Sequence, residues 1–157
     1  MLNDRTACFF GHRHIEETEG LKNNLYYVIE NLIIEKNVNT FLFGSKSAFD
    51  NLCHEVVTEL KQQKYPDIKR IFIRAEYPYI NEDYERYLLQ FYEDSYYPET
   101  LLGANRAVYV KRNYEMIDKS KYCVIFYNEN FAPTKRKSGT KIALDYALKK
   151  KKEIIML

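Results

Sequence analysis

Short apolar runs alternate with longer amphipathic segments along the chain. Five runs of four to six residues are rich in Ile, Val, Phe and Tyr, which predicts buried β-strands. They cover residues 6–10, 40–43, 70–74, 122–127 and 153–156. Between these runs, apolar side chains recur at three- and four-residue spacing. This spacing predicts helices over residues 18–36, 48–63, 81–92, 108–120 and 140–150.

The alternation of continuous apolar strands with amphipathic helices predicts an α/β fold. Strands that are apolar on both faces are typical of a parallel sheet covered by helices on each side. We therefore expect a Rossmann-like three-layer sandwich with a mainly parallel sheet of about five strands. No repeat, linker or low-complexity stretch divides the 157 residues, so residues 1–157 are predicted to form a single domain.

Composition narrows the classes of partner. The net charge is only +2, which gives no strong case for a nucleic-acid or anionic-membrane partner. The chain shows no signal peptide and no run near the ~20 apolar residues of a membrane span, so we expect a cytoplasmic protein. Fifteen tyrosines include a cluster between Tyr77 and Tyr97, which we interpret as a candidate interface of a homo-oligomer.

The three cysteines are interpreted as buried, reduced thiols. Cys8, Cys53 and Cys123 are odd in number and widely spaced, and two of them lie inside apolar runs. This pattern does not match a disulfide framework or a zinc site. We predict no bound metal and no cofactor.

Three polar, glycine-containing segments follow predicted strands or open predicted helices. In a parallel sheet, ligands bind where the strands end and the next helices begin. Glycine allows close backbone approach there, and helix amides with Ser or Thr hydroxyls suit an anion. The alternative for each segment alone is a simple turn with a helix cap. The candidate ligand-binding residues from these segments are Gly11, His12, Arg13, Gly44, Ser45, Lys46, Ser47, Ser138, Gly139 and Thr140.

Four other residues are candidates for charge or chemistry. Arg112 and Asn113 lie in a predicted helix that leads into the most apolar strand, where the arginine fork suits a phosphate. The alternative role of Arg112 is a salt bridge at the start of the helix. Glu115 and Asp50 are the candidate catalytic acids or bases. The chain contains no GxGxxG, GxxxxGK[ST] or GxSxG motif, which excludes the standard dinucleotide fingerprint, the Walker loop and the nucleophile elbow.

Four segments resemble the YpsA-like branch of the SLOG superfamily, which also includes the Smf/DprA proteins and the Lonely-guy phosphoribohydrolases. They are Cys8–Arg13, Phe43–Asp50, Lys111–Asp118 and Lys137–Thr140, and the resemblance covers essentially the whole chain. It implies a Rossmann-like fold with a site for nucleotides or their derivatives. It does not imply one reaction, because some members cleave a base from a ribose phosphate, some sense nucleotide-derived signals and some bind DNA.

The chain departs from this resemblance at two places. Branch members commonly have two glycines where this chain has Gly44 and Ser45. The phosphoribohydrolases carry an acid shortly after their Gly-Thr pair, whereas Lys141, Ile142 and Ala143 follow Thr140 here. The missing acid argues against an intact base-releasing enzyme.

The expected function is binding of a small nucleotide or nucleotide-derived phosphate ligand by a sensor or regulatory module. One alternative is a hydrolase of an N-glycosidic or phosphate bond that uses Glu115 or Asp50. The other alternative is a protein- or DNA-interaction scaffold. Intact Gly11, Gly44 and Gly139 argue against a scaffold that has lost its pocket.

Overall fold

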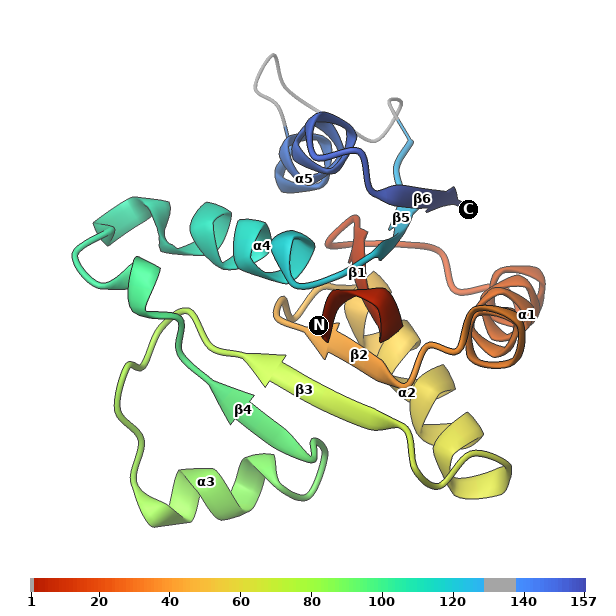
Figure 1. Cartoon of the computed structure of the whole chain (residues 1–157), viewed down its shortest axis with the longest axis horizontal. Helices are drawn as coiled ribbons and strands as arrows, with labels where there is room; N and C mark the ends of the chain where they lie inside the picture. Colours follow the sequence, from red (N-terminus) through yellow and green to blue (C-terminus); the bar gives the residue numbers. More distant parts are fainter. Residues whose placement is uncertain (1, 129–137) are drawn as a thin grey trace.

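The computed structural model describes residues 2–128 and 138–157. Their strands form one all-parallel sheet. The strand order is β4-β3-β2-β1-β5-β6 (Figure 1). The strands are β1 (Thr6–Gly11), β2 (Thr40–Phe43), β3 (Lys69–Ile73), β4 (Asp94–Tyr96), β5 (Tyr122–Phe126) and β6 (Glu153–Met156). The predicted α/β, Rossmann-like class is confirmed. The predicted count of about five strands is corrected to six in the described part of the chain.

The additional strand, β4, lies at the edge of the sheet. It pairs in parallel with β3, with Ile71 opposite Asp94 and Ile73 opposite Tyr96. It has only three residues, Asp-Ser-Tyr, and none of them is fully buried. A short polar edge strand carries no apolar run, and therefore its sequence gives no strand signal.

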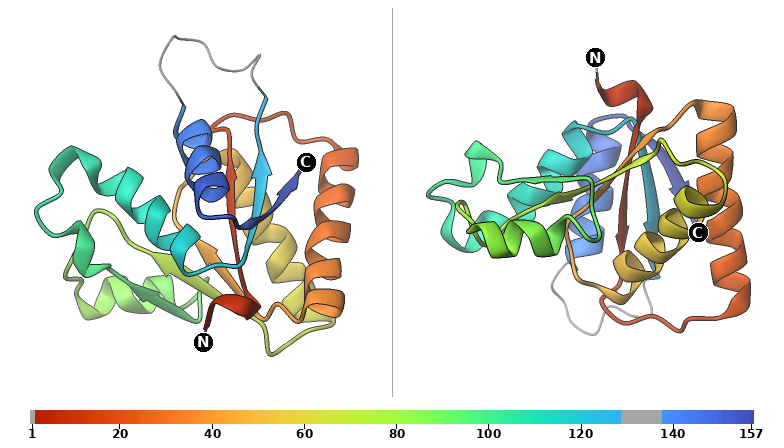
Figure 2. Two further views of the ribbon diagram at one scale, coloured as in Figure 1. Left: turned by 45° about the horizontal axis from the view of Figure 1, so that its top comes forward. Right: turned by 90° about the horizontal axis from the view of Figure 1, so that it is seen from below.

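The side chains of each central strand alternate between two cores. In β1, Ala7 and Phe9 point into the core formed with α1 (Glu19–Lys36) and α2 (Ala48–Gln63). Cys8 and Phe10 point into the core formed with α4 (Val108–Asp118) and α5 (Gly139–Lys149). This period of two explains the uninterrupted apolar runs and the three layers visible in Figure 2.

The smaller helices complete the description. The remaining α-helix is α3 (Glu82–Leu88), and short 3₁₀ turns cover Leu2–Arg5, Glu99–Leu101 and Asn105–Ala107. The helix predicted to reach residue 92 thus ends earlier, at Leu88. Tyr92 instead packs its ring on Phe72, with the ring centroids 5.1 Å apart. The chain has to turn after α3 for Tyr92 to reach Phe72. The helix therefore ends at Leu88, although the helical pattern of the sequence continues to residue 92.

The order of the strands creates a switch point beside β1. The chain runs outward from β1 through β2 and β3 to β4, then returns by α4 to β5 on the other side of β1. The connections that leave β1 and β5 therefore diverge at the carboxyl edge. Open parallel sheets bind ligands at such an edge.

All three cysteines are buried, as predicted, and none forms a disulfide. Cys8 and Cys123 are neighbours on β1 and β5, with their Sγ atoms 3.7 Å apart. Among the described residues, no helix has both the length and the apolar character needed to cross a membrane. Lys137, the first residue of the fourth resembling segment, lies outside the described residues.

Candidate functional site

A cleft of about 420 Å³ lies at the carboxyl edge of the sheet. It collects segments that are far apart in sequence: the end of β1, the loop between β2 and α2, the start of α4 and the start of α5. Its lining is Phe10, Gly11, His12, Arg13, Ser45, Lys46, Ser47, Tyr109, Arg112, Asn113, Ser138, Gly139 and Thr140. Gly44, the remaining candidate from the sequence, lines an adjoining compartment. The structure thus brings together the whole candidate ligand-binding set, while the binding itself stays a prediction.

Two helices present their N-termini to this cleft, and each begins at a serine cap. The Ser47 hydroxyl accepts a hydrogen bond of 3.1 Å from Asp50 N–H at the start of α2. The Ser138 hydroxyl accepts one of 3.1 Å from Lys141 N–H at the start of α5. The first amides of a helix have no acceptor within the helix, and the helix dipole makes this end positive. The arrangement is chemically suited to an anion.

The segment before α2 is further held by its own serines. The Ser45 hydroxyl donates to the Ser47 hydroxyl at 3.0 Å, and Ser47 N–H donates to Ser45 Oγ at 3.3 Å. Arg13 holds this segment from the β1 side, because its carbonyl accepts a hydrogen bond of 2.9 Å from Ala48 N–H. Lys46 and the Arg13 side chain are exposed, so their positive charges are free to face a ligand.

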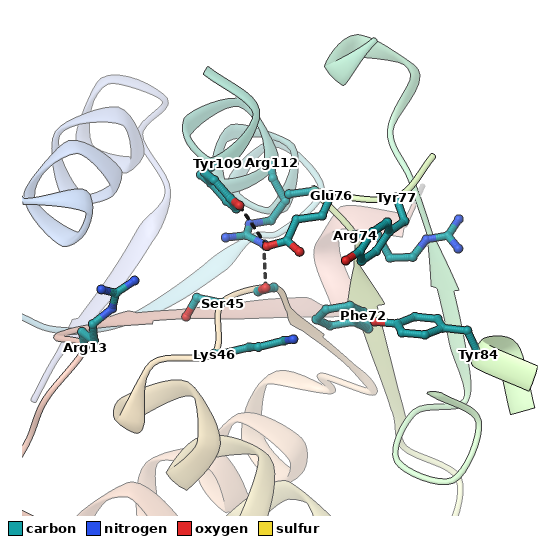
Figure 3. Close-up of a pocket in the computed structure, with 12 residues that line it drawn as sticks. Arg13, Ser45, Lys46, Phe72, Arg74, Glu76, Tyr77, Tyr84, Tyr109 and Arg112 are labelled. Carbon is teal, nitrogen blue, oxygen red and sulfur yellow. Dashed lines mark hydrogen bonds between the residues drawn. The ribbon is translucent and has the colours of Figure 1, made fainter. Parts of the chain in front are cut away.

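Arg112 is the buried cation of the cleft. Its side chain is only 5% exposed, and its Nη1 donates to the Gly44 carbonyl at 2.5 Å (Figure 3). Its Nε donates to Asn113 Oδ1 at 2.9 Å, and its guanidinium carbon lies 5.8 Å from the centroid of the Tyr109 ring. Burial lowers the pKa of the guanidinium, and arginine nevertheless remains charged at neutral pH. Arg112 therefore anchors the β2–α2 loop to α4 and also places a positive charge at the ligand edge.

Asp50 lies buried in the first turn of α2, with 4% of its surface exposed. Burial raises the pKa of its carboxyl to about 8, although the Arg112 charge and a hydrogen bond from the Gly44 backbone oppose the shift. These contacts indicate that Asp50 supports the loop from beneath. It is outside the lining of the cleft, where a catalytic acid or base has to reach its substrate.

Glu115 is placed away from the cleft. Its Oε2 accepts a hydrogen bond of 2.8 Å from the Tyr96 hydroxyl, and it lines a separate cavity near Thr6 and Thr40, the first residues of β1 and β2. These are the amino ends of the strands, opposite the ligand edge. Glu115 therefore lies apart from the cleft, because α4 runs from one edge of the sheet toward the other, and its catalytic role stays a prediction.

His12 lines the cleft and also makes a structural contact. It is 8% exposed, and its Nε2 accepts a hydrogen bond of 2.7 Å from Asn128 N–H. Burial lowers the pKa of the imidazole, so the neutral form is favoured. A neutral ring supplies no positive charge to a phosphate. His12 also ties the loop after β1 to the loop after β5, and a contact of its ring with the sugar or base of a ligand stays a prediction.

Two of the three site glycines are required by close packing within the protein. A Cβ on Gly11 would lie 2.3 Å from ring carbons of Phe49, and a Cβ on Gly44 would lie 2.6 Å from Arg112 Cδ. A Cβ on Gly139 would meet no atom of the described residues within 4 Å. The sequence argument assigned all three glycines to close approach of a ligand. For Gly11 and Gly44 the structure provides an internal reason.

The cleft continues into a second compartment of about 340 Å³, which the sequence reasoning missed (Figure 3). The two share Arg13, Ser45, Lys46, Tyr109 and Arg112. The added lining, from β3, the loop after it and α3, is Phe72, Arg74, Ala75, Glu76, Tyr77 and Tyr84, together with Gly44. The available signal was the tyrosine cluster between Tyr77 and Tyr97, which includes Tyr77 and Tyr84 but was interpreted as a candidate interface of a homo-oligomer.

Comparison with known families adds one finding. The family model described as the YspA SLOG family matches residues 7–157, which is essentially the whole chain. A search of curated proteins returns no match. The matched region includes every residue of the cleft and of its second compartment.

Proposed function

The chain belongs to the YpsA family of SLOG proteins, and from this membership and the cleft we propose that it binds a nucleotide or nucleotide-derived phosphate ligand. Family membership alone suggests binding or processing of nucleotide-related ligands. The finer proposal is that the protein is a ligand-binding module with a sensor or regulatory role. In it, the phosphate lies between the N-termini of α2 and α5, beside Arg112.

One observation carries the proposal: two capped helix N-termini and a buried arginine line the same cleft. The helix ends contribute amide donors and the positive ends of two dipoles. Arg112 contributes a guanidinium that the Gly44 carbonyl and Asn113 already hold in place. Little ordering of these groups remains to be done when an anion arrives, which favours binding.

We propose binding in preference to hydrolysis because neither candidate carboxylate lines the cleft. Asp50 is buried beneath the loop, and Glu115 lies toward the opposite edge of the sheet. A scaffold without a ligand is also less consistent with a cleft of about 420 Å³, which falls within the size range of small-molecule sites.

The test is isothermal titration of AMP into the wild type and two variants, at low and high salt. We expect Arg112→Ala to weaken binding more than tenfold, which is about 1.4 kcal/mol. Lys150→Ala removes a charge from the exposed residues Lys149–Lys151 and should have a much smaller effect. Salt screens exposed charges more than buried ones, so the Arg112 contribution should persist at high salt.

Arg112→Lys separates the ligand contact from the structural contact. Lysine keeps the positive charge and loses the planar fork that holds the Gly44 carbonyl. Thermal unfolding of each variant shows how much of the lost affinity reflects lost fold. Equal losses for Arg112→Ala and Lys150→Ala, both disappearing at high salt, would replace the proposed site with diffuse attraction to a basic surface.

A further inference from the structure

The second compartment is walled by aromatic rings from separate parts of the chain. Phe72 comes from β3, Tyr77 from the loop that follows it, Tyr84 from α3 and Tyr109 from α4. In Figure 3, Phe72, Tyr77 and Tyr84 lie on the side of the pocket opposite Arg13. The compartment therefore has an aromatic end, which also carries Arg74, and a cationic end that is shared with the cleft of the proposed phosphate site.

These tyrosines are only partly used by the protein's own packing. Tyr77 is 52% exposed and Tyr109 is 49% exposed, whereas Phe72, at 9%, is nearly covered. Tyr77 and Tyr84 pack against each other with ring centroids 6.0 Å apart and planes inclined by 64°. Such an edge-to-face pair leaves ring surface available to a further planar group.

Glu76 gives this compartment a carboxylate that the described lining of the neighbouring cleft lacks, beside the cations Arg13, Lys46, Arg74 and Arg112. Glu76 is the one acidic residue in the described lining, and its Oε1 accepts a hydrogen bond of 2.9 Å from the Tyr109 hydroxyl. A carboxylate attracts hydroxyl or amino groups and repels a phosphate at close range. The carboxylate thus adds a partner for an amino or hydroxyl donor, whereas the cleft offers two helix N-termini to an anion, and Arg112 is shared by both.

We infer that this compartment binds the aromatic base of the ligand, while the phosphate of the same ligand occupies the adjoining cleft. The inference rests on the proposed function. It adds a substrate class, since a nucleotide that carries its base is bound in preference to a sugar phosphate. Stacking of a base on an aromatic side chain is a general and sequence-tolerant source of affinity.

The experiment compares AMP, ribose 5-phosphate and adenosine as titrants by calorimetry. The wild type should bind AMP at least tenfold more tightly than ribose 5-phosphate. Tyr77→Ala should weaken the affinity for AMP about tenfold and leave the affinity for ribose 5-phosphate unchanged, because only the contact with the base is removed. Tyr77→Phe keeps the ring and should retain the affinity for AMP.

Tyr79→Ala is the matched control. Tyr79 lies in the same loop two residues further on, is 88% exposed and is outside the lining of the compartment. It should leave the affinities for AMP and ribose 5-phosphate at their wild-type values. An equal loss of AMP affinity in Tyr77→Ala and Tyr79→Ala would assign the effect to the loop as a whole and overturn the base site.

The outcomes separate this inference from the proposed function. If AMP and ribose 5-phosphate bind equally and Tyr77→Ala changes neither, the base site is wrong and the phosphate site stands. If Tyr77→Ala lowers the affinity for AMP and for ribose 5-phosphate by the same factor, the base site is also overturned. If none of the three titrants binds, the inference and the proposed function fail together.

Discussion

Replacing Gly44 by alanine should destabilise the protein through contacts inside it. The added Cβ would lie 2.6 Å from Arg112 Cδ and 2.7 Å from Met116 Sδ. Met116 is 1% exposed and Arg112 is 5% exposed, so neither can move into solvent without leaving the core. Arg112 is also held by its hydrogen bond to the Gly44 carbonyl. The substitution must displace one side chain or shift the β2–α2 loop.

Overpacking of a well-packed site costs about 1–3 kcal/mol. Replacing glycine by alanine returns about 0.4–1 kcal/mol by restricting the unfolded chain, so the net loss for Gly44→Ala should be about 1.3 kcal/mol, within a range of about 0 to 2.6 kcal/mol. For a protein of this size, each kcal/mol lowers Tm by about 2–4 °C. Urea denaturation and thermal unfolding both measure the change.

Two other glycines provide the comparison. Gly139→Ala should be neutral or stabilising by up to about 1 kcal/mol, because its Cβ meets no atom in the part of the chain that the structure describes and alanine favours the helix. Gly11→Ala should be the most damaging of the three, since its Cβ would lie 2.3 Å from ring carbons of the fully buried Phe49. If Gly44→Ala proved as stable as Gly139→Ala, the packing argument for the β2–α2 loop would be refuted.

Two further predictions concern protonation. Burial raises the pKa of Asp50 to about 8, so its stabilising contribution is complete below its unfolded pKa near 4 and is lost as pH rises toward 8. The free energy of unfolding of Asp50→Asn, measured by urea denaturation and expressed relative to the wild type, should therefore rise between about pH 4 and 8; a flat difference would contradict the raised pKa. For His12, burial lowers the pKa and Nε2 accepts from Asn128 N–H. Nitrogen NMR should therefore show a neutral ring protonated on Nδ1 at pH 7, titrating below its ordinary value of about 6.5; a ring protonated on Nε2 would rule out this hydrogen bond.

The fold was largely predictable because its signals are local. The central strands are continuous apolar runs, and α1 and α2 follow apolar spacing with a Thr or Ser cap directly before them. The failures occur where distant residues decide the outcome. β4 forms because β3 offers a free edge, and α3 ends early because Tyr92 packs on Phe72.

The site was predictable as a set of segments but less so in the roles of its residues. The carboxyl-edge rule placed the Gly44, Arg112 and Gly139 segments together, because all parallel strands end at the same edge. The role of His12 depends on Asn128, a contact across 116 positions of sequence that no local pattern reports. The aromatic compartment likewise depends on the fold to bring Tyr77 beside Tyr109.

The most direct test of the central claim is amide NMR of the protein during titration with AMP. The account predicts that the amide signals of Ser47, Gly139 and Thr140 shift together and saturate with one dissociation constant, because they line the proposed phosphate site. Arg112→Ala should reduce these shifts at the same concentration of AMP. Shifts confined to the basic run Lys149–Lys152, with the starts of α2 and α5 unaffected, would contradict the claim.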